Sequence, residues 1–78
     1  MAVLNIWEAA MRIKDLREDR DLTQRDVADY LHVKQNTYSQ YENGQRQLPI
    51  NALIALAKFY RTSTDYILGL TNERKPYR

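Results

Sequence analysis

The stretch LTQRDVADYLHVKQNTYSQYENG, residues 22–44, decides how this chain folds. Apolar residues recur in it at helical spacing, which predicts one helix over about 23–31 and a second over about 35–42. Asn43-Gly44 is a signal for the end of the second helix, because Gly and Asn readily adopt the backbone conformation that follows a helix C-terminus. The stretch is therefore expected to form two short helices with only three residues between them.

The connection between these two helices indicates a particular motif. It consists of His32, Val33 and Lys34, and so short a turn between two short helices is typical of a helix-turn-helix. Ala28 supports this interpretation, because a small side chain on the first helix lets the second cross close to it. In this motif the second helix, 35–42, is the recognition helix that enters the major groove of DNA.

The rest of the chain is also expected to be helical. Two glycines and two prolines among 78 residues, with helix formers nearly everywhere, predict an all-α protein. No segment alternates apolar and polar residues for long enough to be a convincing strand. Further helices are expected over about 6–20, over about 49–60 and, as a short fifth helix, over about 63–68. The whole chain is long enough for one small domain.

Composition narrows the classes of function. Without cysteine there is no disulfide framework and no thiolate metal site, which fits a cytoplasmic protein. The start of the chain lacks the pattern of a signal peptide, and no apolar run is long enough to span a membrane. His32, the single histidine, has no cysteine or acidic partner at ligand spacing, and no serine has a nearby base. We therefore expect no enzyme, no metal, no cofactor and no small-molecule substrate.

Uncharged polar side chains surround the two tyrosines of the recognition helix. Gln and Asn can each form two hydrogen bonds with adenine in the major groove. Gln35 and Asn36 lie at the helix N-terminus, which enters the groove first, and Gln40 returns to the same face. Tyr38 and Tyr41 are three residues apart and anchor the opposite face in the core. This pattern predicts that at least two of the three amides read bases, whereas a polar face that merely meets water is the alternative for any single one.

Three stretches of the sequence resemble a known family. Residues 13–70 resemble the Cro/repressor (Xre-like) family of phage and bacterial helix-turn-helix regulators, through LTQRDVADYLHVKQNTYSQYENG, QLPINALIALAKFY and STDYILGL. The resemblance implies a compact five-helix bundle of the lambda-repressor-like type over residues 1–70, followed by a flexible C-terminal tail, 71–78. It also implies a sequence-specific transcriptional regulator, in our interpretation a repressor that acts by occupying its operator.

The resemblance assigns roles to individual residues. Arg17 and Glu42 occupy positions that the family often joins by a salt bridge between the first and third helices. The base-reading positions are occupied by Gln35, Asn36, Ser39 and Gln40. Gln24, Asn43 and Arg46 occupy positions where the family contacts the DNA backbone. Beside them, we expect Lys34 and Thr37 to contact phosphates.

Three positions depart from the family pattern. His32 replaces the usual glycine of the turn, where a positive φ is expected that costs a histidine more than a glycine. Lys34 replaces the usual Ser or Thr N-cap and cannot accept the N–H bonds of the next helix, so we expect it to contact a phosphate instead. Arg61 stands where Gly or Asn is usual. These substitutions affect local stability and leave the predicted fold unchanged.

Double-stranded DNA is the expected partner, with an inverted-repeat operator. One recognition helix covers few base pairs, so paired regulators place two helices in major grooves about 34 Å apart. We expect weak pairing through the end of the fifth helix, Tyr66–Thr71, because Ile67 and Leu70 look surplus to the core. An N-terminal contact through Leu4 and Trp7 is the alternative. The alternative function on the same fold is that of an antitoxin or antirepressor, whose main partner is a protein. In either case we expect a protein encoded by a bacterium or a phage.

Overall fold

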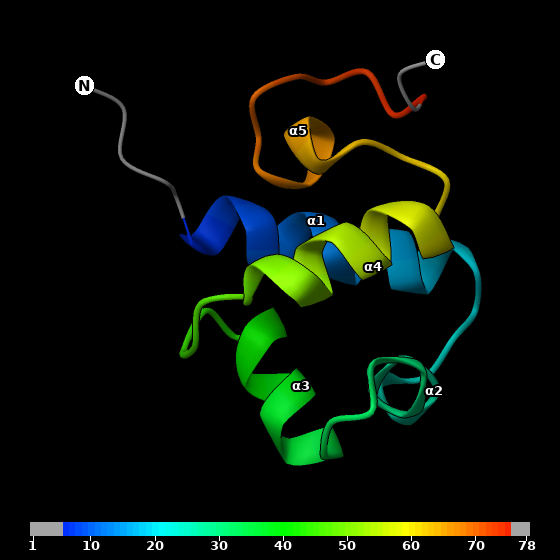
Figure 1. Cartoon of the computed structure of the whole chain (residues 1–78), viewed down its shortest axis with the longest axis vertical. Coiled ribbons are helices and arrows are strands. Elements are labelled where there is room, and N and C mark those ends of the chain that lie inside the picture. The colour runs from blue at the N-terminus through cyan, green and yellow to red at the C-terminus, as the bar shows by residue number, and fades with distance from the viewer. Residues whose placement is uncertain (1–5, 76–78) are drawn as a thin grey trace.

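The structure is a computed structural model that describes residues 6–75 of the chain. These residues form five α-helices and no strand, as the sequence predicted (Figure 1). The helices are α1 (Ile6–Asp19), α2 (Gln24–Leu31), α3 (Gln35–Glu42), α4 (Ile50–Phe59) and α5 (Thr64–Ile67).

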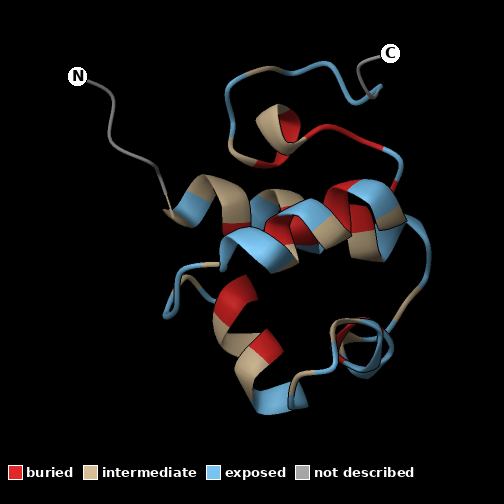
Figure 2. Cartoon of the chain, viewed as in Figure 1, coloured by how far each residue is buried: buried red, intermediate tan, exposed pale blue. Residues whose placement is uncertain are grey.

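The helix-turn-helix lies at one end of the molecule. In Figure 1, α2 and α3 occupy the lower end, α5 the upper end, and α1 and α4 lie between them. α1 contacts both α3 and α5, while α2 packs on α3 and α4 packs on α5. One side of α3 is thereby held against the bundle, and its first turn is left at the surface (Figure 2).

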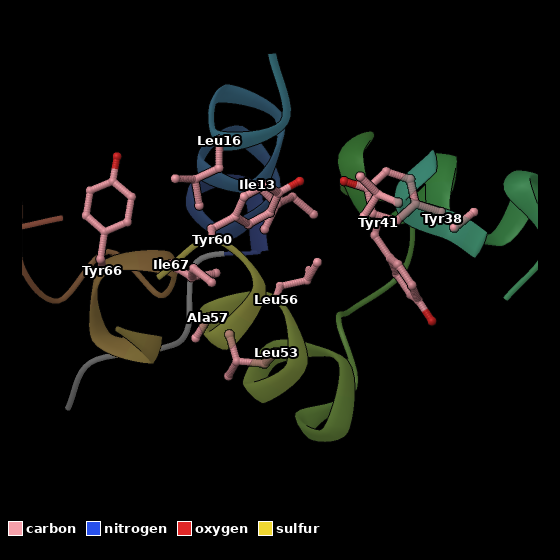
Figure 3. Packing of buried hydrophobic residues seen from close by; sticks show 12 residues of the cluster. Ile13, Leu16, Tyr38, Tyr41, Leu53, Leu56, Ala57, Tyr60, Tyr66 and Ile67 are labelled. Atoms are coloured by element: carbon pink, nitrogen blue, oxygen red, sulfur yellow. The ribbon is translucent and has the colours of Figure 1, made fainter. Parts of the chain in front are cut away.

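A single apolar core joins the helices (Figure 3). It receives side chains at helical spacing, which is the pattern of a helix with one inward face. Burying a Val, Leu or Ile side chain completely contributes roughly 1.5–3 kcal/mol, so these contacts are the main source of stability in so short a chain. The buried apolar residues are Ala10, Ile13, Leu16, Val27, Ala28, Tyr38, Tyr41, Leu53, Leu56, Ala57, Tyr60, Tyr66 and Ile67.

The start of α2 is set by a capping box. The backbone N–H of Asp26 donates to Thr23 Oγ1 over 3.0 Å, and the backbone N–H of Thr23 donates to Asp26 Oδ2 over 2.9 Å. These bonds, first of all the one from the Thr23 backbone, lower the pKa of Asp26 below its usual value. Both partners lie within four residues, so the helix start is encoded locally.

The turn into α3 contains the positive φ expected at the usual glycine position. His32 has φ 59° and ψ 40°, and its backbone N–H donates to the Asp29 carbonyl over 3.1 Å. Arg61, after α4, has φ 56°. Lys34 is the N-cap of α3 and makes no side-chain cap bond. The sharp turn is thus formed without the glycine and the hydroxyl cap that usually favour it.

The end of the chain corrects one prediction. Ile67 is not surplus to the core: it is fully buried. α5 packs against both α1 and α4, so two adjacent side chains of this short helix, Tyr66 and Ile67, can both be covered. Leu70 alone of the predicted pair is exposed, at 64%. Leu4, named in the alternative N-terminal contact, lies outside the described residues.

Residues 71–75, part of the segment predicted to be a flexible tail, contact the bundle. Arg12 donates from Nη1 to the Thr71 carbonyl over 2.9 Å and from Nη2 to Asn72 Oδ1 over 2.8 Å. Arg74 lies 2.6 Å from Asp19 Oδ2 and donates to the Tyr66 hydroxyl over 3.1 Å. The segment therefore runs back towards α1 and α5.

None of the helices in the described part of the chain has both the length and the apolar character needed to cross a membrane.

Candidate nucleic-acid interface

The recognition helix α3 has an inward tyrosine side and an outward amide side. Tyr38 and Tyr41 are buried in the core, and their rings meet edge to face with centroids 6.2 Å apart. Gln35 and Asn36 are exposed in the first turn. The partly exposed polar residues further along α3 are Thr37, Ser39 and Gln40. The division into core and surface faces that the spacing predicted is present.

The buried hydroxyl of Tyr38 points towards that of Tyr60 across the core (Figure 3). Burial disfavours the charged form of a phenol, and it raises the pKa of Tyr60 to about 12. Burial also raises the pKa of Tyr38 above its usual value. Both phenols therefore remain neutral at physiological pH, and the inward side of α3 brings no tyrosinate charge into the core.

A two-pronged ion pair holds the last turn of α3. Arg17 Nε lies 2.7 Å from Glu42 Oε2, and Arg17 Nη2 lies 3.0 Å from Glu42 Oε1. The side chains of this pair, whose positions the family resemblance had singled out, are only 12% and 2% exposed. Arg17 also donates from Nη1 to the Leu22 carbonyl over 2.8 Å. One guanidinium thus ties α3 to α1 and to the connection before α2.

Gln24 extends this pair into a network. Its Nε2 donates to Glu42 Oε1 over 3.1 Å, so the first residue of α2 contacts the last residue of α3. Burial by itself would raise the pKa of Glu42, but the hydrogen bonds from Arg17 and Gln24 and the charge of Arg17 outweigh burial and lower it. The carboxylate therefore stays ionised and links the two helices of the motif.

The loop after α3 folds back over the helix. Gly44 has φ 72°, and a Cβ at this position would come 2.7 Å from Trp7 Cε3. The backbone N–H groups of Gln45 and Arg46 both donate to the Gln40 carbonyl, over 3.0 and 3.3 Å. Arg46 Nε also donates to the side-chain oxygen of Gln40 over 2.9 Å. A residue expected to contact phosphate is thereby joined to one expected to read bases.

Six of the predicted DNA-contacting residues fall into two groups, one at each end of α3. Lys34, Gln35 and Asn36 are exposed together at its start. Gln40 and Arg46 meet at its other end. Their neighbour Asn43 is the exposed C-cap. Gln24 stands apart from both groups, because its amide is turned to Glu42.

Three of the contacts around α3 could not be predicted from the spacing of residues. They join Gln24 to Glu42, Arg46 to Gln40, and the Trp7 ring to the backbone of Gly44. No periodicity links the members of these pairs. Gly44, which follows the C-cap of α3, is a signal for the reversal of the chain, because its φ is positive.

Comparison with known proteins identifies relatives of this chain. A family model described as "Helix-turn-helix" matches residues 13–67. The uncharacterized HTH-type transcriptional regulator YobD of Bacillus subtilis (strain 168) is 35% identical over 65 residues, 83% of this chain and 58% of the relative. The HTH-type transcriptional regulator ImmR of the same organism is 36% identical over 58 residues, 74% of this chain and 46% of the relative.

A further relative is the cryptic phage CTXphi transcriptional repressor RstR of Vibrio cholerae. It is 45% identical over 49 residues, 63% of this chain and 44% of the relative. The chain spans about half the length of the curated relatives it matches. No solved structure matches it.

Proposed function

Because this chain belongs to the helix-turn-helix family whose model matches residues 13–67, we propose that it is a sequence-specific DNA-binding regulator of transcription that represses by occupying an operator. The observation that carries the proposal is the uncharged amide face of α3, presented by a helix that an almost fully buried ion pair holds in place. One relative is itself named a transcriptional repressor. The proposed domain covers residues 1–70, of which 1–5 lie outside the described residues.

In the proposed complex, α3 enters the major groove with its first turn leading. Base edges there present fixed donors and acceptors, which Gln and Asn amides can match. Gln35 and Asn36 are exposed at this end and reach bases first, while Ser39 and Gln40 contact bases further along the groove. Since α3 is already locked to α1 and α2 through Glu42, little freedom is lost when the helix binds.

Phosphate contacts flank the base-reading residues. Lys34 is exposed directly before α3, and Arg46 is exposed in the loop after it. Contacts of this kind set the register of a protein on the duplex without reading sequence. Gln24 bonds Glu42 with one amide hydrogen and has a second for a phosphate oxygen. The remaining proposed phosphate contacts are Thr37 and Asn43.

We further propose that two copies of the chain bind an inverted repeat. The protein would act in the bacterial cytoplasm and be encoded by the bacterium or by a phage. The pairing surface is the exit of α5, where Leu70 is exposed. A patch that small gives weak association in solution, which becomes cooperative when DNA aligns both copies. Trp7, the rival contact, is 60% exposed and has its ring against Gly44.

One observation favours a protein partner as a second candidate function, that of an antitoxin or antirepressor. An apolar groove of about 270 Å³ lies between α1 and α4, with Ile6, Ile13, Leu48 and Leu53 in its lining. A protein partner seated there would leave the amide face of α3 without a role. The two candidate functions therefore predict different effects of mutation. Substitutions on the amide face of α3 should impair DNA binding, whereas substitutions in the groove should impair binding of a protein partner.

Selection of bound duplexes from a random pool tests the primary proposal. We expect an inverted-repeat consensus whose half-sites are one helical turn apart. Gln35→Ala and Asn36→Ala should each relax the preference at particular base pairs, at roughly 1–3 kcal/mol for a lost bidentate contact. Ile50→Ser is the matched control, because Ile50 is exposed on α4 and lies in the groove instead. Enrichment of no sequence, together with a tight protein complex that Ile50→Ser weakens, would replace repression by the second candidate.

A further inference from the structure

Residue 46 is bonded to residue 40 through both its main chain and its side chain. The Arg46 backbone N–H donates to the Gln40 carbonyl, and Arg46 Nε donates to Gln40 Oε1 over 2.9 Å. The positive φ of Gly44 produces the reversal that brings the loop back, and the Trp7 ring lies against this turn. The backbone of the loop therefore places Arg46 beside Gln40. The bond between the two side chains forms because they are already close together.

This bond engages the oxygen of the Gln40 amide. An amide has one oxygen that accepts and one NH₂ group that donates twice. Because Arg46 binds the oxygen, the NH₂ group is the part of Gln40 that is left to turn to the DNA. The Arg46 contact uses Nε, so Nη1 and Nη2 are the donors with which the guanidinium can reach a phosphate.

Resting on the proposed function, we propose that Arg46 is a positioning residue for base recognition, and that it commits Gln40 to reading guanine. Guanine presents two acceptors, N7 and O6, in the major groove, whereas adenine presents the acceptor N7 beside the N6 amino donor. A free Gln reads adenine by pairing its oxygen with N6 and its NH₂ group with N7. Beside Arg46, the NH₂ group of Gln40 donates to the guanine acceptors instead.

Electrostatics strengthens the same choice. The Gln40 oxygen keeps a second lone pair, but an adenine amino group that approached it would bring the positive end of its N–H dipole towards the guanidinium. Guanine O6 and N7 carry the opposite partial charge and are attracted to it. Gln40 and Arg46 together thus present hydrogen-bond donors and positive charge, which match the two acceptors of guanine.

The test measures base preference at one operator position. From the selected consensus, the position read by Gln40 is the one whose preference is lost in Gln40→Ala. Affinities of the full chain for duplexes with each of the four base pairs at this position are then compared for the parent, Arg46→Met and Lys34→Met. Methionine removes the charge with a similar chain length, and Lys34 is a matched exposed cation at the other end of α3. Circular dichroism confirms that each variant is folded.

We expect the parent to favour guanine over adenine by roughly 5- to 150-fold, the range that corresponds to discrimination by a good base contact. In Arg46→Met the ratio should fall to about twofold or less, because the freed amide can read adenine as well. Lys34→Met should weaken all four duplexes by the same factor.

Three results would overturn the inference while the proposed function stands. They are a uniform loss of affinity in Arg46→Met, a parental preference for adenine at this position, and a Gln40→Ala consensus identical to that of the parent. If the parent selects no sequence at all, the proposed function itself fails and this inference with it.

Discussion

Replacing Arg17 by methionine tests whether the ion pair beneath α3 holds the motif together. The substitution leaves the Glu42 carboxylate, whose side chain is 2% exposed, without its cationic partner. Gln24 still donates one hydrogen bond to it. Leaving one charge of a buried pair without its partner destabilises a protein by about 3–5 kcal/mol. Because the Gln24 amide still bonds Glu42, we expect the loss of folding free energy to lie at the lower end, near 3 kcal/mol.

That loss is large for a chain of this size. At about 0.05–0.15 kcal/mol per residue, a chain of 78 residues has a free energy of unfolding of roughly 4–12 kcal/mol. In a small domain 1 kcal/mol moves the Tm by about 4–8 °C, so Arg17→Met should melt roughly 12–24 °C below the parent. Arg25→Met is the matched control, because Arg25 is exposed on α2 and such a change usually stays within about 0.5 kcal/mol.

The pH dependence separates lost charge pairing from lost packing. In the parent the pKa of Glu42 lies below its usual value, so the carboxylate contributes stability that is present above about pH 4.3 and lost as the pH falls through the lowered pKa. In Arg17→Met burial without the cation raises that pKa, so acidification neutralises the stranded carboxylate. The gap between variant and parent should therefore narrow as the pH falls from 7 to about 4.

Urea and thermal unfolding followed by circular dichroism at pH 7 and pH 4 measure both effects. If Arg17→Met melts like the parent and Arg25→Met at pH 7, the pair is not a structural lock. If it is destabilised equally at both pH values, the loss comes from the missing side-chain packing and the charge argument is wrong.

The remaining predictions concern the turn, the pairing surface and the end of the chain. Lys34→Ser should raise the free energy of unfolding by about 1 kcal/mol in urea titrations, because serine can cap α3, and should weaken binding to every duplex alike. His32→Gly should raise it by about 0.5–1 kcal/mol, since φ is 59° and glycine adopts this conformation without strain; an unchanged value would contradict the strain. Leu70→Asp should abolish cooperative binding to a palindrome while half-site affinity persists, and retained cooperativity would exclude α5 as the pairing surface. Arg74→Ala, which removes the contacts to Asp19 and the Tyr66 hydroxyl, should speed amide exchange at residues 71–75 with little change in Tm; unchanged exchange would show that these contacts do not hold the segment.

Local signals determined the helices and the motif. The Thr23–Asp26 capping box and Asn43-Gly44 act through groups within four residues of one another, so they mark helix ends whatever the rest of the chain does. The inward turn of Tyr38 and Tyr41 follows equally from helical spacing. Thus the five helices, the short turn and the outward amide face of α3 could be predicted before any contact between helices was known.

Packing between helices decided the rest, because it depends on crossing angles that no spacing encodes. Glu42 joins Arg17 and Gln24, which lie 25 and 18 residues away in the chain, and only the Arg17 contact was foreseen, through family resemblance. Ile67 is buried because two helices cover α5, which its sequence alone does not reveal. The reversal at Gly44 sets Arg46 against Gln40. The sequence thus determined which amides point outward from α3, whereas the tertiary structure determined that Arg46 engages the oxygen of one of them.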